Sequence, residues 1–123
     1  MLNHTLKMLV KKNLNEGTSH WFNQRVSSVI LIPITVLFIV TFIQNVGLGY
    51  EKNMNFYKNP VSALLTFSFI YLTLLHFKQG AQVVIEDYVE DKTVHRVLLK
   101  INVTLFWVMN LLAVFSFAKL VLE

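Results

Sequence analysis

The sequence predicts an all-α membrane protein with three transmembrane helices. Of its 123 residues, 54% are hydrophobic and 15% are charged, whereas soluble domains carry about 25% charged residues. The apolar residues fall into three runs, each close to the roughly 20 residues that a helix needs to cross a bilayer. The residues left between these runs are too few for a large soluble domain.

An amino-terminal tail, residues 1–19, precedes the predicted membrane part. It carries three lysines and ends in a turn-like polar stretch. Leu6, Leu9 and Val10 would share one face of a short surface helix, and a partly ordered tail is the alternative. We therefore expect a cytoplasmic or matrix tail followed by a three-helix anchor over residues 20–123.

The first two spans are predicted at about 26–46 and 61–85. Pro33 lies within the first span and should bend it, because proline removes one backbone hydrogen bond from a helix. Two glycines end this span, and a polar loop is expected over residues 47–59. Pro60 suits the first turn of the second span.

The third span is predicted at about 101–121, after a strongly charged turn over residues 86–92. Its first half contains three polar residues in a mainly apolar run. Polar side chains in a membrane helix usually face other helices. We expect Asn102, Thr104 and Asn110 to do so.

The distribution of basic residues predicts the orientation in the membrane. Three spans put the two termini on opposite sides, with seven Lys and Arg residues on the amino-terminal side and three on the other. The positive-inside rule then places the amino-terminal side in the cytoplasm, or in the matrix of an organelle. The same rule explains the net charge of +4 without a nucleic-acid partner. The chain has no cysteine, so it holds no disulfide and no thiolate-bound iron–sulfur cluster.

The residues best suited to bind a metal or a cofactor lie toward the end of the second span. At about 100° per residue, His76, Gly80, Val83 and Asp87 share one helix face. Asp87 should lie roughly 16 Å along the axis from His76. One face therefore combines a metal-ligand type in the apolar layer with polar groups near the water boundary.

His76 has two interpretations, a hydrogen-bonded core histidine or a metal ligand. Ionisable residues inside membranes are usually functional, and Gly80 would leave room for a flat macrocycle one turn away. His76 would then supply one axial ligand to a haem iron, and another chain would supply the second, because the other histidines lie near or beyond the membrane edges. A hydrogen bond from Nδ1 to the Leu72 carbonyl would leave Nε2 for the metal.

Asp87 and Tyr88 form either an ordinary polar helix end or part of a quinone site. A phenol donates a hydrogen bond to a quinone carbonyl, and an adjacent carboxylate holds an arginine or passes protons. Arg25 and Ser28 near the start of the first span would approach the same site. In the alternative interpretation, Trp21 and Arg25 are only a membrane-edge aromatic and a positive-inside charge.

Lys78 has no evident partner. A lysine within a span costs about 2.5–3.5 kcal/mol on insertion scales. It lies about 200° around the helix from His76, so the two cannot share a face. Either its side chain extends to the membrane surface or a polar group of another element receives it.

Two segments resemble the small cytochrome b membrane-anchor subunit of succinate dehydrogenase. The sequence His-Trp-Phe-Asn-Gln-Arg-Val, beginning at His20, is similar to the start of that subunit's first helix. The stretch from His76 to Val89 resembles its second helix, with Gly four positions after the His and Asp-Tyr eleven and twelve positions after it. Together with the third span, the resemblance covers about residues 17–123.

The resemblance implies half of a heterodimeric six-helix anchor bundle. Its partners would be a second membrane-anchor subunit, an iron–sulfur subunit and a flavoprotein subunit that holds the succinate site. By the same resemblance, His76 matches the haem b ligand and Tyr88, beside Asp87, matches the ubiquinone-bonding tyrosine. Arg25 matches an arginine near the quinone and the haem propionates. The chain would lie in a bacterial cytoplasmic membrane or a mitochondrial inner membrane.

Two other functions remain open from the sequence. One is the anchor of a related quinol:fumarate reductase. The other is a three-span assembly or adaptor protein with no redox site. The sequence favours the succinate dehydrogenase anchor, in which electrons from succinate reach ubiquinone, because of the His76 and Asp87–Tyr88 pattern.

Overall fold

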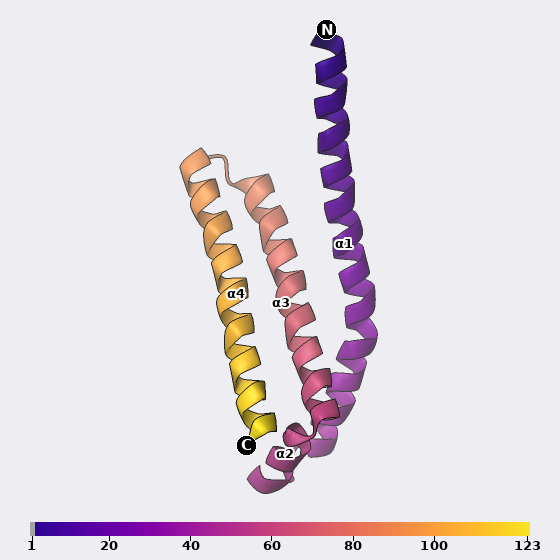
Figure 1. The fold of residues 1–123 in the computed structure, drawn as a ribbon, viewed down its shortest axis with the longest axis vertical. Helices are drawn as coiled ribbons and strands as arrows, with labels where there is room; N and C mark the ends of the chain where they lie inside the picture. The colour runs from indigo at the N-terminus through magenta and orange to yellow at the C-terminus, as the bar shows by residue number, and fades with distance from the viewer. Residues whose placement is uncertain (1) are drawn as a thin grey trace.

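The computed structural model describes residues 2–123, which form four α-helices in the order α1 to α4 (Figure 1). Their bounds are Leu2–Asn45 for α1, Tyr50–Lys58 for α2, Pro60–Tyr88 for α3 and Lys92–Leu122 for α4. Three of them, α1, α3 and α4, are long and apolar enough to cross a membrane. The predicted all-α, three-span architecture is therefore confirmed.

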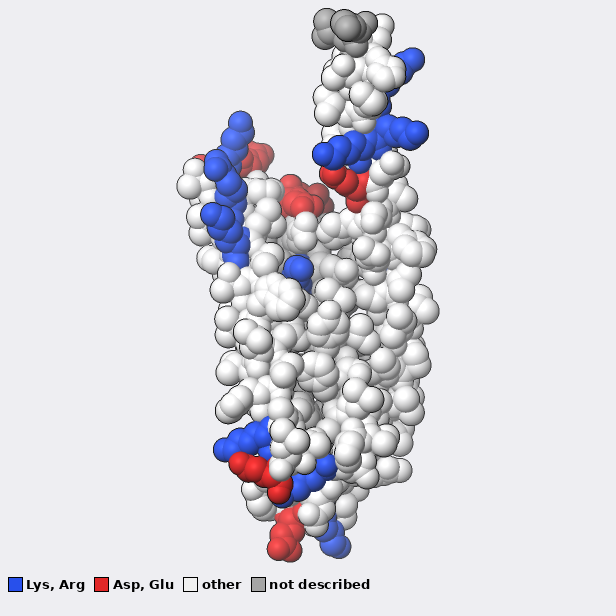
Figure 2. All heavy atoms as spheres, viewed as in Figure 1, with Lys and Arg blue, Asp and Glu red and all other residues white. Residues whose placement is uncertain are grey.

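The three long helices lie side by side, with α3 between α1 and α4 (Figure 1). The amino-terminal end of α1 projects beyond the turn that joins α3 to α4, while α2 and the carboxyl terminus lie at the opposite end. Charged atoms gather at these two ends, and the wide band between them is almost free of charge (Figure 2). This band is the part that a bilayer would enclose.

Helix α1 is longer than the predicted first span. Residues 2–19 are helical and continuous with the span, and the side chains of residues 3–19 are exposed. Pro33 stays inside the helix, which bows along its length without breaking (Figure 1). The Thr35 hydroxyl donates to the Leu31 carbonyl at 2.6 Å, one of the local side-chain bonds by which membrane helices tolerate proline.

The predicted polar loop over residues 47–59 is wrong in part, because it contains the nine-residue helix α2. Gly47 and Gly49 have φ values of 84° and 86°, which turn the chain out of α1 at little steric cost. Tyr50, Met54 and Tyr57 follow at helical spacing and line one side of an apolar cavity of about 390 Å³. This spacing was the sequence signal for a short surface helix.

The ends of α3 and α4 are fixed by side-chain caps. Asn59 accepts a hydrogen bond from the Val61 amide at 2.9 Å, with Pro60 in the first turn. Asp91 accepts from the amides of Thr93 and Val94, both at 2.9 Å. These caps satisfy donors that helix starts otherwise leave unpaired.

The protein buries few of its large apolar side chains. Ala63 and Phe106 are its buried hydrophobic residues, and Phe38 stacks on Phe69 with 4.1 Å between ring centroids. Forty large hydrophobic side chains along the described chain are instead exposed, on every long helix. Lipid or another protein must therefore cover most of this surface.

Helical spacing decides which polar residues of α4 face the neighbouring helix. Asn102 and Asn110 are buried, as expected, and the Asn102 amide donates to the Lys78 carbonyl of α3 at 2.9 Å. Thr104 is exposed in this chain, so its contact with another helix, which a partner subunit would have to supply, stays a prediction. Positions 102, 106 and 110 are four apart and share a face, whereas position 104 lies about 200° away from 102.

Candidate functional site

His76 of α3 and Ser28 of α1 meet across the helix interface. The His76 Nδ1 atom lies 3.3 Å from the Ser28 hydroxyl oxygen, and both side chains are half-buried. The two residues are 48 positions apart in the chain. The structure thus joins two residues that the sequence placed in one site.

The hydrogen bonds of Ser28 are compatible with a metal-binding tautomer of His76. A hydroxyl has one hydrogen, and the Ser28 hydroxyl donates to the Gln24 carbonyl at 2.8 Å. With its hydrogen on Gln24, the Ser28 oxygen can accept a hydrogen bond from Nδ1 of His76, and in that tautomer Nε2 keeps its lone pair. The Nε2 tautomer stays a prediction, and the structure places the Ser28 hydroxyl, not the predicted Leu72 carbonyl, at Nδ1.

A second polar bridge lies beside the first. The buried Ser27 hydroxyl lies 3.0 Å from Oε1 of Gln79 and 2.9 Å from the Gln24 carbonyl. Gln79 follows His76 by three residues, so both face α1. The Ser27–Gln79 pair was missed from the sequence, although adjacent serines facing a His and a Gln at helical spacing are the pattern that predicts it.

Space is open at Gly80, one turn beyond His76. A Cβ atom built there would meet no other atom within 4 Å. A flat group could therefore lie against the α3 backbone at this position, on the same helix face as His76. The donor type and the open backbone both fit an axially ligated macrocycle.

Arg25 does not take part in the contact between Ser28 and His76. Its guanidinium lies over the Trp21 ring, 5.4 Å from the centroid, and its side chain is exposed. Such a contact stabilises by about 0.5–1 kcal/mol at an exposed site. Arg25 precedes Ser28 by three residues and so lies one turn nearer the amino-terminal end of α1.

Asp87 and Tyr88 lie in the last turn of α3, apart from His76. Both are exposed, Tyr88 to 81% of its surface. The roughly 16 Å of helix between His76 and Asp87 keeps the two groups from forming one pocket within this chain. The residues predicted for α3 therefore lie at two separate places, His76 in the middle of the helix and Asp87 with Tyr88 at its end.

Lys78 points toward α4, away from the Ser28 contact. Its ammonium lies 4.9 Å from the centroid of the Phe106 ring. This contact supplies the environment that the sequence left open, and it agrees with the angular separation of Lys78 from His76. Lys78 therefore does not contribute to the His76 face.

Within the described residues, no group of three or more His, Asp or Glu side chains is arranged to hold a metal ion. His95 lies at the start of α4, where its Nδ1 is 3.4 Å from the Val89 carbonyl. Of the described histidines, His76 is the one that lies within the apolar part of a long helix.

Comparison with known proteins finds one family. Residues 5–117 match the family described as the succinate dehydrogenase/fumarate reductase transmembrane subunit. The chain is 30% identical over 106 residues to a succinate dehydrogenase hydrophobic membrane anchor subunit of Paracoccus denitrificans, covering 86% of this chain and 81% of the relative. A protein of the same description from Rickettsia felis is 29% identical over 110 residues, covering 89% and 91%. No solved structure gives a significant match.

Proposed function

The chain belongs to the succinate dehydrogenase/fumarate reductase transmembrane subunit family, and from this membership we propose that it anchors the flavoprotein and iron–sulfur subunits of succinate dehydrogenase to the membrane. In this role the chain holds no succinate site. With a second anchor subunit it would complete a helix bundle that binds haem b and ubiquinone. The extensive apolar surface left exposed on α1, α3 and α4 supports such a partner.

The relatives favour succinate oxidation over fumarate reduction. Both curated relatives described above are named succinate dehydrogenase anchors, while the family includes both complexes. The fumarate reductase anchor is therefore the weaker alternative. The non-redox adaptor is the other, and it predicts no cofactor at His76.

The proposed redox role rests on the surroundings of His76. Its Nδ1 lies 3.3 Å from the Ser28 hydroxyl, which supports a tautomer with a free Nε2, and the backbone one turn away at Gly80 is open. His76 would hold the haem iron through Nε2, with Arg25 near a propionate or the quinone, and the second anchor subunit would give the other axial ligand. When bound, haem b supplies a one-electron redox group. The absorbance of the purified complex tests this, since a reducible haem b band is expected and its absence would favour the adaptor.

Ser28 would act as a positioning residue for His76. Its hydroxyl hydrogen is donated to Gln24, so donation to a quinone would first require that bond to break. Tyr88 retains an exposed phenol and Asp87 an exposed carboxylate. We assign the quinone hydrogen bond to Tyr88 and a proton-holding role to Asp87, and keep a quinone contact of Ser28 as a secondary prediction.

Replacing Ser28 with alanine should weaken haem binding without removing it. Loss of a partner that orients a metal-bound histidine typically costs about 10–100-fold in metal affinity. Ser28→Thr keeps the hydroxyl and should restore haem content. Ser116 also donates to a carbonyl four residues earlier but lies on α4, so Ser116→Ala is the matched control. Equal haem content in Ser28→Ala and Ser116→Ala would remove Ser28 from this role.

The amino-terminal side should face the cytoplasm, or the matrix in an organelle, because seven of ten flanking Lys and Arg residues lie there. The native chain lacks cysteine, so single cysteines can be placed at the exposed positions Asn13, Asn55 and Thr93. An impermeant thiol reagent added to intact cells should label Asn55→Cys alone. Labelling of Asn13→Cys and Thr93→Cys, with Asn55→Cys protected, would reverse the orientation.

A further inference from the structure

The amino-terminal segment of α1, residues 3–19, carries an apolar stripe formed by Leu6, Leu9, Val10 and Leu14. Spacings of three and four residues place these side chains on one face of the helix. Each of the four is more than half exposed. Residues 2–123 of this chain therefore leave the stripe uncovered, although α1 is helical throughout it.

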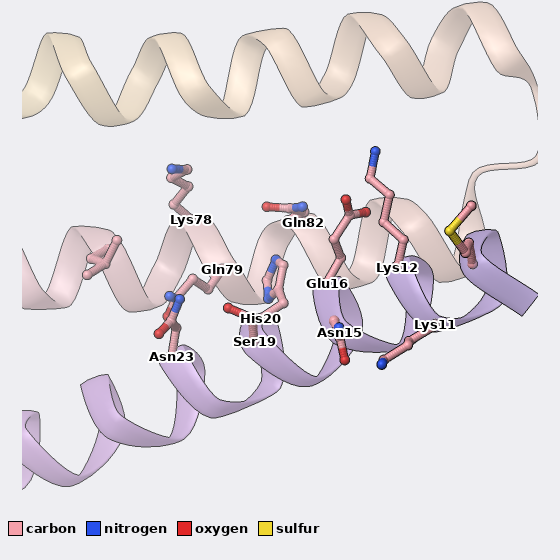
Figure 3. Close-up of a pocket in the computed structure, with 12 residues that line it drawn as sticks. Lys11, Lys12, Asn15, Glu16, Ser19, His20, Asn23, Lys78, Gln79 and Gln82 are labelled. Atoms are coloured by element: carbon pink, nitrogen blue, oxygen red, sulfur yellow. The ribbon is translucent and has the colours of Figure 1, made fainter.

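The other side of the same segment is polar. Lys11, Lys12, Asn15 and Glu16 line a groove of about 820 Å³ next to α3 (Figure 3). Met8 is the apolar residue of the segment on that side, and it is also exposed. The segment holds three lysines and one carboxylate. It is therefore an amphipathic helix with a net positive charge.

The stripe faces the side of α1 on which α3 lies. Because about 18 residues complete five turns of an α-helix, Leu9 points in the same direction as Ser27, whose hydroxyl contacts α3. Gly17 and His20 lie between them along this side and, with Glu86, line a cavity of about 590 Å³ near the end of α3. The stripe therefore overlooks the exposed end of α3.

The stripe also stands beyond the end of α3. Nine residues of α3 follow Gln79, whereas 25 residues of α1 precede Ser27, its partner across the interface. At a rise of about 1.5 Å per residue, α1 extends roughly 24 Å past the end of α3, as its projecting end shows (Figure 1). No residue of α3 is left at this height to cover the stripe.

Lipid cannot cover the stripe while α1 is continuous. The uncharged run of α1 starts after Arg25, which marks the membrane boundary, and Leu14 lies 11 residues before it, or about 16 Å along the helix. Lipid headgroups occupy only about 5–8 Å on each side of the hydrocarbon layer. The stripe thus lies in the water layer, where a protein surface is the cover available to it.

We propose that this stripe binds the iron–sulfur subunit. The choice of partner rests on the proposed function, which places the soluble subunits on this side and the cluster-bearing one next to Tyr88, for electron transfer to the quinone. A subunit seated on the end of α3 would also meet the stripe, because the stripe overlooks that end. Apolar anchors at this spacing typically dock in an apolar groove of a partner.

The lysines predict the charge around that groove. Lys7 and Lys11 are exposed and line a shallow depression together with Leu6, Val10 and Leu14. Cations at the edge of an interface are matched by anions on the partner. We therefore expect acidic residues beside the apolar groove of the iron–sulfur subunit.

The test measures how fast the soluble subunits leave isolated membranes during washing. Leu6→Gln combined with Val10→Gln removes two anchors and keeps helix propensity, and Met8→Gln is the matched control on the polar side. Truncating an interface anchor costs about fivefold or more in affinity. Flavin and succinate oxidation with an artificial acceptor should therefore appear in the supernatant at least about tenfold faster for the double variant. Met8→Gln should behave like the native chain, and membrane haem should be unchanged in both.

Photocrosslinking of the assembled complex then identifies what covers the stripe. A benzoylphenylalanine placed at Leu9 should crosslink to the iron–sulfur subunit, and one placed at Met8 should not. A crosslink from Leu9 to lipid would show that the segment bends onto the membrane, and one to the flavoprotein or to a second copy of this chain would show a different partner. Each of these results would overturn the proposal, as would equal release by the double variant and Met8→Gln. The proposed function would survive them, and it fails only if the native chain retains no flavin and no succinate oxidation.

Discussion

Replacing His76 with alanine should abolish the axial bond that we propose this chain gives to the haem iron. Loss of an outer partner of a metal-bound histidine costs about 10–100-fold in affinity, so loss of the ligand itself should lower haem content by at least that factor. The remaining haem should lose the six-coordinate spectrum. The Ser28 hydroxyl keeps its bond to Gln24, and His76 is only half-buried, so the helix pair should still form.

The control for this variant is His95→Ala. His95, in the first turn of α4, is also half-buried, and its Nδ1 lies 3.4 Å from the carbonyl of Val89, which caps the end of α3. Its replacement should leave the haem spectrum intact. A six-coordinate spectrum of normal intensity in His76→Ala, or an equal loss in both variants, would contradict the ligand assignment.

Replacing Tyr88 with phenylalanine should impair quinone reduction far more than electron entry from succinate. Tyr88 ends α3 at the boundary beside the charged turn, and its ring is 81% exposed, so the fold does not depend on its hydroxyl. Reduction builds negative charge on the quinone oxygen, and a phenol donor should stabilise that charge increasingly along the reaction. Loss of a hydrogen bond to a charged group costs about 1.5–3 kcal/mol, or roughly ten- to a hundredfold in rate if quinone chemistry limits turnover.

Two assays separate this effect from misassembly. One measures succinate oxidation with an artificial acceptor that takes electrons before the quinone, and the other uses ubiquinone. Tyr50→Phe is the matched control, since Tyr50 is 76% exposed at the opposite end of the molecule. Equal loss in both assays would indicate misassembly, and full activity with ubiquinone would exclude Tyr88 from the quinone site.

Helical spacing predicted most of what the structure shows within one chain. The three spans followed from apolar runs, and the opposed directions of His76 and Lys78 followed from the angle between adjacent helix positions. Helix α2 was missed because nine residues of mixed polarity were assigned to a polar loop, although Tyr50, Met54 and Tyr57 recur at helical spacing. Thr104 points away from the side of α4 that carries Asn102, because the two positions differ by about 200° around the helix.

Contacts between spans required the packed structure. The sequence named Ser28 and His76 separately, but only the register of α1 against α3 brings the hydroxyl to Nδ1. The same register pairs Ser27 with Gln79. Tyr88 is exposed within this chain. In the proposed complex, other subunits would cover it and complete the quinone site.

The account is tested most directly by the proteins that copurify with this chain in mild detergent. A tagged chain should bring down a flavin-containing subunit, an iron–sulfur subunit and a second small apolar subunit in equal amounts, together with succinate–ubiquinone activity. The copurified flavin and the activity should both be lost when α3 is deleted from the chain. Recovery of the chain without flavin and without succinate oxidation, in membranes where it is well expressed, would contradict the assignment as a succinate dehydrogenase anchor.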